Sequence, residues 1–137
     1  MGDIIRKVDY FKIEVPNKAG EGAKVLGALR EAGVNLLAFT GFPRGRRAQM
    51  DFFPEDAPAF RKAVKSAGFA IGGRKSAFLI QGEDRAGAIA EVASKLGAAG
   101  ISITALDGVA AGEGRYGAIL WVDPKDVGKA AKVLGAR

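Results

Sequence analysis

Apolar and polar residues recur in a regular order along this chain, and the pattern predicts short strands separated by helices. Residues 11–15 alternate between apolar and charged side chains, which is typical of a strand with one buried face. Residues 22–32 then carry apolar side chains at helical spacing and are followed by a glycine, as helix ends commonly are. Two segments rich in strand-forming residues, 34–42 and 44–53, follow and predict a hairpin with its turn at the glycines.

The same series then continues to the end of the chain. Residues 56–67 have the apolar spacing of a second helix, and the glycine-rich segment 68–73 predicts a short strand after it. The remaining elements that the pattern predicts are a strand at 76–81, a helix around 89–96, strands at 101–109 and 115–122, and a helix from Pro124 to Leu134.

This order arises because the chain repeats itself. The segment "NKAGEGAKVLGALREAGVNL" aligns with "DRAGAIAEVASKLGAAGISI", so that Gly20 matches Gly87 and Gly33 matches Gly100, sixty-seven residues further along. The alignment extends upstream to "FKIEV" and "FLIQG". A repeat of this length indicates two copies of one structural unit.

Within each copy the order is strand, helix, strand, strand, helix, strand, which is the ferredoxin-like plan. We therefore expect an α+β fold of two βαββαβ repeats, with antiparallel sheets and helices on one face. The expected domains are residues 1–74 and 75–137. The second copy ends after its last helix and so lacks a final strand; we expect the lead-in Asp3–Val8 to cover the sheet edge left open.

Composition bears on the class of function. The chain has 137 residues with no cysteine and no histidine, which removes thiolate nucleophiles and the commonest general base and metal ligand. The adjacent acids Glu55-Asp56 and Glu83-Asp84 precede predicted helices, where acids are favoured for capping. We therefore expect no enzymatic activity, no metal and no cofactor.

Charge and hydropathy narrow the expected partners. The formal net charge is +6, and residues 1–75 hold all of this excess, with a local cluster at Arg44, Arg46 and Arg47. Apolar runs are too short for a membrane span, and the start of the chain lacks the apolar core of a signal peptide, so we expect a cytoplasmic protein without membrane contact.

An RNA-binding module of the same topology is the alternative. Such modules expose aromatic residues on their third strand, and "GRYGAILWV" has Tyr116 and Trp121 on the corresponding strand. However, Ile119 and Leu120 fall where the stacking residue belongs, and this half of the chain has no net charge. Packing in a core accounts better for Trp121 and Phe52, so nucleic acid is an unlikely partner.

The glycines near residue 20 raise a second alternative, a phosphate-binding loop. Gly22 and Gly27 are spaced as in a Walker loop, but an alanine and a leucine stand where the lysine and the hydroxyl residue belong. At the start of this helix, the glycine that persists in the second copy is Gly20, as Gly87. This persistence indicates a backbone requirement at the strand-to-helix junction rather than phosphate binding.

The junction has groups that would suit an α-amino acid. The N–H groups at the start of a helix attract a carboxylate, and amide oxygens accept hydrogen bonds from an ammonium group. Asn17 precedes the first helix and Asn35 precedes the next strand, which we expect to run beside the first. The two amides would then converge on one ligand. The alternative is that Asn17 and Asn35 are ordinary turn residues that bind no ligand.

The order of elements, with "NKAG…GVNL" and "DRAG…GISI" at the junctions, resembles ACT domains, the small-molecule sensing modules of amino-acid metabolism. The family pattern is Asn or Asp, any residue, Pro and Gly, then a helix and a Gly-hydrophobic-Asn-hydrophobic entry to the second strand. Asn17, Gly20, Gly33 and Asn35 match this pattern, whereas an alanine replaces the proline in both copies.

The resemblance implies a free-standing tandem ACT protein that binds an amino acid near a domain interface, forms a homodimer, and modulates a partner enzyme or regulator of amino-acid metabolism. In the ACT domain of a serine-inhibited dehydrogenase, asparagines in these two positions bind the effector across such an interface. The ligand-binding residues that the resemblance implies are Asn17, Lys18, Ala19, Gly20, Glu21 and Asn35 in the first copy, and Asp84, Arg85, Gly87 and Ser102 in the second.

Overall fold

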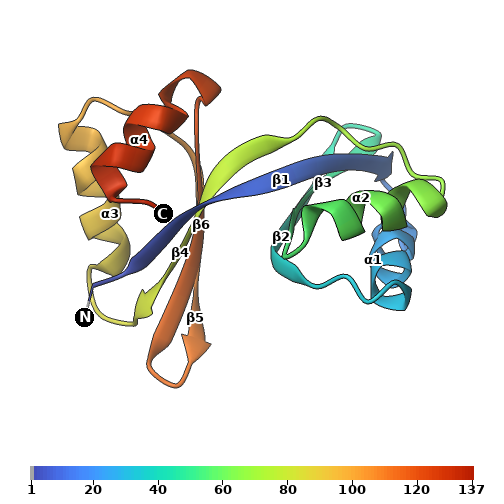
Figure 1. Ribbon diagram of the computed structural model, residues 1–137, viewed down its shortest axis with the longest axis horizontal. Helices are drawn as coiled ribbons and strands as arrows, with labels where there is room; N and C mark the ends of the chain where they lie inside the picture. The colour runs from blue at the N-terminus through green and yellow to red at the C-terminus, as the bar shows by residue number, and fades with distance from the viewer. Residues whose placement is uncertain (1) are drawn as a thin grey trace. The chain divides into compact units, whose positions relative to one another are not determined.

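The computed structural model describes residues 2–137, which form two compact units (Figure 1). The first unit is Asp9–Lys75, and the second consists of Ser76–Arg137 together with the residues up to Val8. The expected first domain, 1–74, therefore differs from the first unit in its lead-in, which the structure groups with the second unit. The α+β fold class that the sequence predicts is confirmed, with antiparallel strand pairs and helices in both units.

The first unit has a sheet with the strand order β2-β3-β1 and two helices that pack on one face of it. Alternate residues of the strands meet the apolar stripes of the helices, so that Phe11, Phe52, Phe60 and Leu29 are almost fully buried. The elements are β1 (Ile4–Pro16, of which residues 9–16 belong here), α1 (Glu21–Glu31), β2 (Leu36–Arg44), β3 (Arg47–Pro54) and α2 (Ala57–Ser66).

Two local predictions in this unit differ from the structure. The predicted strand 68–73 is irregular, although the Gly72 N–H donates a hydrogen bond of 2.9 Å to the Lys12 carbonyl of β1. Glycines at 72 and 73 supply no side chains to pack, which weakens a strand. The hairpin turn lies at Gly45–Arg46 rather than at 41–45, because Pro43 is accommodated within β2, at the edge of the sheet.

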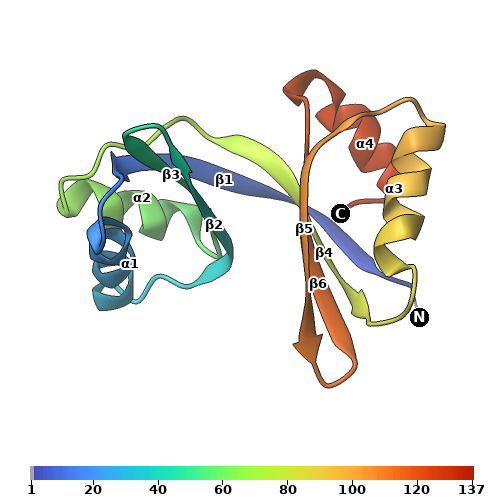
Figure 2. The same cartoon turned by 180° about the vertical axis from the view of Figure 1, so that it is seen from behind.

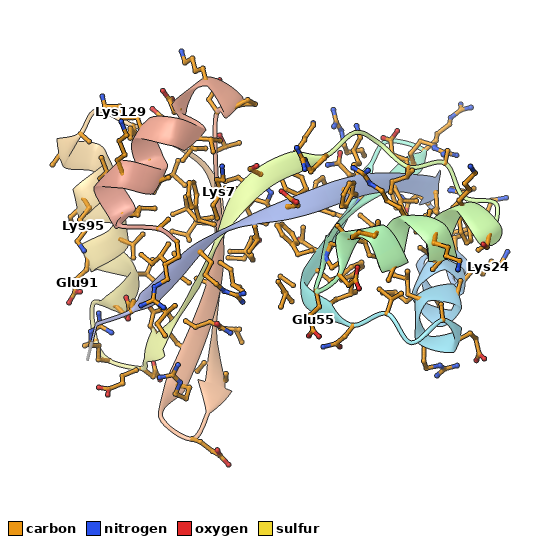
Figure 3. The ribbon with its side chains drawn as sticks, viewed as in Figure 1. Lys7, Lys24, Glu55, Glu91, Lys95 and Lys129 are labelled. Carbon is orange, nitrogen blue, oxygen red and sulfur yellow. The ribbon has the colours of Figure 1, made fainter. Side chains whose placement is uncertain are left out.

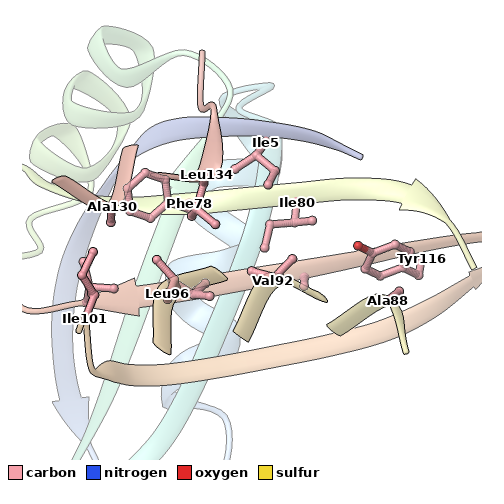
Figure 4. Close-up of a cluster of buried hydrophobic side chains, with 13 residues drawn as sticks. Ile5, Phe78, Ile80, Ala88, Val92, Leu96, Ile101, Tyr116, Ala130 and Leu134 are labelled. Atoms are coloured by element: carbon pink, nitrogen blue, oxygen red, sulfur yellow. The ribbon is translucent and has the colours of Figure 1, made fainter. Parts of the chain in front are cut away.

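The second unit contains the remaining elements around a separate core (Figure 4). Its strand order is β1-β4-β6-β5, where β1 contributes its first residues, and β5 is the edge strand (Figure 2). The elements are β4 (Lys75–Glu83), α3 (Ala88–Ala98), β5 (Ile103–Gly112), β6 (Arg115–Val122), a 3-10 turn (Pro124–Asp126) and α4 (Val127–Leu134).

The lead-in strand Ile4–Val8 occupies the sheet edge that the second copy leaves open, as the sequence predicts. It belongs to β1 and neighbours β4. Ile5 is 7% exposed and packs in the core of this unit with Phe78 and Leu134. On its other side, the Ile5 carbonyl and the Lys7 N–H exchange hydrogen bonds with the backbone of Arg137, at 3.0 and 3.1 Å.

The glycine that persists between the copies has the same conformation in both. Gly20 precedes α1 with φ of 88°, and Gly87 precedes α3 with φ of 82°. This left-handed backbone is costly for residues with a Cβ atom, so the junction requires glycine. No side chain caps either helix start; the first N–H of each helix instead donates to a carbonyl of the preceding turn, Glu21 to Lys18 and Ala88 to Arg85, both at 3.3 Å.

We expect Gly20→Ala to destabilise the protein by roughly 1 kcal/mol, because alanine is strained at positive φ. Gly27→Ala is the matched control: Gly27 lies within α1, and a Cβ there meets no atom within 4 Å. The control should be more stable than the wild type by roughly 0.5–1 kcal/mol. Urea denaturation measures both; equal effects of the two substitutions would contradict the assigned backbone role of Gly20.

Candidate functional site

The two asparagines that the sequence predicts to converge lie at opposite ends of the first unit. Asn17 follows the last residue of β1, whereas Asn35 precedes the first residue of β2. Both strands pair antiparallel with β3, which lies between them, so they run in the same direction. The eight residues of β3 span roughly 25 Å. The expectation that β2 runs directly beside β1 is wrong, and with it the convergence within one unit.

Each asparagine contacts a different part of the first unit. The Asn17 side-chain amide lies 3.5 Å from the Gly45 carbonyl in the hairpin turn, and the Asn35 amide donates to Glu55 at 3.1 Å. In Figure 3, Glu55 and Lys24, a first-turn residue of α1, mark these two ends. Asn35 also lines a cavity of about 370 Å³ beside the end of α1.

The other predicted residues of the first copy surround the start of α1. Lys18, Ala19 and Gly20 are exposed in the turn, and Glu21 begins the helix with an ion pair to Lys24 at 2.9 Å. Three predicted residues of the second copy, Asp84, Arg85 and Gly87, lie together at the start of α3, whereas Ser102 is exposed before β5, at the opposite end of that sheet.

The junction groove is an open cavity of about 460 Å³ in the second unit, between the start of α3 and the edge strand β5. Residues 87–90, at the start of the helix, line one side of it, and no side chain caps this start. Polar side chains of Asp84, Arg85 and Tyr116 line it together with apolar residues, which are Ala88, Ile89, Ala90, Leu106, Val109 and Ala110.

A hydrogen-bonded network anchors two of these polar side chains. The Asp3 carboxylate accepts from the Tyr116 hydroxyl at 2.6 Å and from two Arg85 nitrogens at 3.2 and 3.5 Å. Arg85 also donates to the Glu83 carbonyl at 2.9 Å and to Glu91 on α3 at 2.8 Å. We call these contacts the Asp3 network. Asp3, whose side chain is 9% exposed, was not among the predicted site residues.

The network shifts the protonation equilibria of its members. Burial by itself would raise the pKa of Asp3, but the hydrogen bonds from Tyr116 and Arg85, with the positive charges of Arg85 and Lys95, lower it overall. Burial and the hydrogen bond to Asp3 raise the pKa of Tyr116 to about 12. The hydrogen bonds to Asp3 and Glu91 raise the pKa of Arg85 further above its usual range. At neutral pH the network is therefore a carboxylate, a phenol and a guanidinium.

The residues that would support RNA binding are buried. Tyr116 is 5% and Trp121 7% exposed, and Phe52 is fully buried, as the sequence predicts for core residues. Stacking on bases needs accessible rings, which these side chains do not offer. Among residues 2–137, no cluster of three or more acidic side chains could hold a metal ion. No helix in this described part combines the length and apolarity needed to cross a membrane.

Comparisons with known proteins show relatives by fold. No family model and no curated protein sequence matches the chain. A protein from Bacteroides thetaiotaomicron has a similar structure, with a TM-score of 0.80 and 22% identity over 97% of this chain and 88% of that one. The regulatory subunit of aspartate kinase from Thermus thermophilus, in a ligand-free form, matches with a TM-score of 0.66 and 19% identity over 98% of this chain and 96% of that one.

A third similar structure is the regulatory subunit of aspartate kinase from Thermus flavus. It has a TM-score of 0.63 and 19% identity, and the match covers 98% of this chain and 95% of that one. At these identities the comparisons establish a shared fold alone, which extends over nearly the full length of the two aspartate kinase subunits.

The pKa of Asp3 is lower in the folded protein than in the unfolded chain. Ionised Asp3 therefore stabilises the folded protein at pH values above the ordinary pKa range of aspartate. This contribution should decrease as the pH falls through that range, and it should be absent once Asp3 is protonated. We expect Asp3→Asn to lower the urea midpoint at pH 7, and the difference from the wild type to shrink towards about pH 2. Urea denaturation at a series of pH values measures this; a pH-independent difference would contradict the assigned ion pair.

Proposed function

We propose that this protein is a tandem ACT-type regulatory protein that binds an amino acid and thereby modulates a partner enzyme or regulator of amino-acid metabolism. The observation that carries the proposal is the junction groove, which has room for a small ligand beside an uncapped helix start. The fold that the chain shares with two regulatory subunits of aspartate kinase supports this proposal, because the names of those proteins describe them as regulatory subunits.

The groove offers a separate partner for each part of an α-amino acid. The backbone N–H groups at the start of α3 attract a carboxylate. Asp84 at the mouth would hold the ammonium group, and the apolar residues of α3 and β5 would contact the side chain. This division between few polar groups and apolar walls is usual for small-molecule sites.

The junction before α1 in the first unit is proposed as a second ligand site, which would be assembled differently from the junction groove. Because Asn17 and Asn35 lie at opposite ends of the first unit, a site that uses both would need a second copy of the chain to bring them together. A homodimer is therefore part of the proposal for this junction. The groove at the second junction needs no such completion, since one unit supplies all its walls.

A thermal-shift screen of the twenty proteinogenic amino acids tests the proposal. At a concentration about 100-fold above its dissociation constant, a one-site ligand should stabilise the protein by roughly 2.7 kcal/mol, which raises the Tm by several degrees. No shift with any of the twenty would contradict amino-acid sensing.

A substitution that fills the junction groove locates the effect. Ala90 is exposed and lines the groove, so Ala90→Trp should abolish the shift. Ala98→Trp, at the exposed last position of the same helix, should leave it unchanged. If both variants respond like the wild type, the amino acid binds elsewhere.

A further inference from the structure

The Asp3 carboxylate connects the first residues of the chain to the junction groove. Asp3 precedes the lead-in strand Ile4–Val8, and its two partners, Tyr116 and Arg85, both line the groove. A Cβ atom built on Gly82 would overlap the Asp3 carboxylate, so glycine at this position of β4 leaves the space that Asp3 fills. Asp3 thus lies behind the groove wall, with both carboxylate oxygens occupied.

The network is specific to the second copy. The sixty-seven-residue offset and the strand registers give the first-copy counterparts of Gly82 and of three network residues, Arg85, Glu91 and Tyr116. The corresponding residues are Val15 for Gly82, Lys18 for Arg85, Lys24 for Glu91 and Ala48 for Tyr116. In the first copy a side chain replaces the space at glycine, and an alanine replaces the hydroxyl donor. Three of the four counterparts, Val15, Lys24 and Ala48, therefore lack the chemistry that the Asp3 network uses, whereas Lys18 keeps the positive charge of Arg85.

The lead-in strand has few other polar anchors on its outer side. Beyond it lies the end of the chain, where the backbone of Arg137 bonds to Ile5 and Lys7. An ion pair and a short hydrogen bond with a carboxylate are among the stronger polar contacts, and Asp3 makes both at the start of this strand.

We propose that Asp3 is a positioning residue for the junction groove, and that docking of the lead-in strand and occupation of the groove stabilise each other. The second half of this inference rests on the proposed function. Asp3 holds Arg85 and Tyr116 in the conformations that form the wall. Loss of Asp3 leaves the Tyr116 hydroxyl without this acceptor and leaves Arg85 with its bonds to Glu83 and Glu91, so both side chains gain freedom at the groove. By reciprocity, a molecule that packs on Arg85 and Tyr116 holds them against Asp3 and secures the strand.

The coupling reaches beyond the second unit through the backbone. β1 is one uninterrupted strand, of which the first residues complete the second unit and residues 9–16 belong to the sheet of the first unit. Occupation of the groove would therefore secure the first residues of a strand whose later residues belong to the sheet of the first unit.

Amide hydrogen exchange of the Lys7 N–H, which bonds to Arg137, tests the positioning role without any ligand. Asp3→Asn should speed this exchange by about tenfold or more, the effect expected for loss of a charged hydrogen bond. Tyr116→Phe removes one partner and should act in the same direction, and the two substitutions together should have less than the product of their separate effects. Asp126→Asn, the same change at a residue of this unit outside the network, should stay within about twofold of the wild type.

Exchange in Asp3→Asn equal to that of the wild type would overturn the positioning role. Amides of β6 serve as the folding control, since they should stay protected in every variant. The coupling is tested with each of the twenty amino acids added singly. Any that raises the Tm of the wild type should also slow Lys7 exchange, and should bind about tenfold more weakly to Asp3→Asn.

The outcomes separate the two proposals. An amino acid that stabilises the wild type but leaves Lys7 exchange unchanged overturns the coupling and leaves the proposed function intact. If none of the twenty acts, the proposed function and the coupling are both wrong, while the ligand-free comparison still decides the positioning role of Asp3.

Discussion

The open edge of β4 is the constraint on which the second unit depends. A sheet edge carries unpaired N–H and C=O groups that need partners, and the elements from β4 to α4 leave this edge of β4 without a neighbouring strand. The lead-in strand fills this place from the other end of the chain, buries Ile5 in the core and pairs on its outer side with Arg137. The complete unit therefore combines two segments that are far apart in the sequence, Ile4–Val8 and Ser76–Arg137.

The junction groove depends on this arrangement. Its position follows from the left-handed glycine that turns the chain from β4 into α3, but the first unit has such a glycine too. The second junction differs in its wall, which Asp3 holds from behind through Arg85 and Tyr116. The two units thus share a left-handed glycine at the strand-to-helix junction but differ in the side chains around it, and Asp3 of the lead-in supports the groove of the second unit.

The hydrophobic pattern was sufficient to predict the order of the helices and strands apart from the irregular segment 68–73, because each strand or helix has its own period in the sequence. The repeat identified the junction glycine, since Gly20 and Gly87 persist while their neighbours change. Strand adjacency was harder to predict. The hydrophobic pattern does not show that β3 lies between β1 and β2. Because this order was not foreseen, the convergence of Asn17 and Asn35 was predicted wrongly.

The Asp3 network escaped prediction because its members are far apart in the sequence. Asp3 and Tyr116 are separated by 113 residues, and no local period relates them. One signal was available: Gly82 stands in a strand position where the first copy has Val15. A glycine within a strand often marks the close approach of another group, which here is the Asp3 carboxylate.

The central claim is that an amino acid occupies the junction groove of the second unit. Backbone amide chemical shifts, followed by NMR while each of the twenty amino acids is added in turn, test this most directly. The account predicts that at least one amino acid shifts the amides of Gly87–Ala90 and of Gly108–Ala110 together, since these segments form facing walls of the groove. If none of the twenty amino acids changes the amide chemical shifts of these two segments, the claim is contradicted.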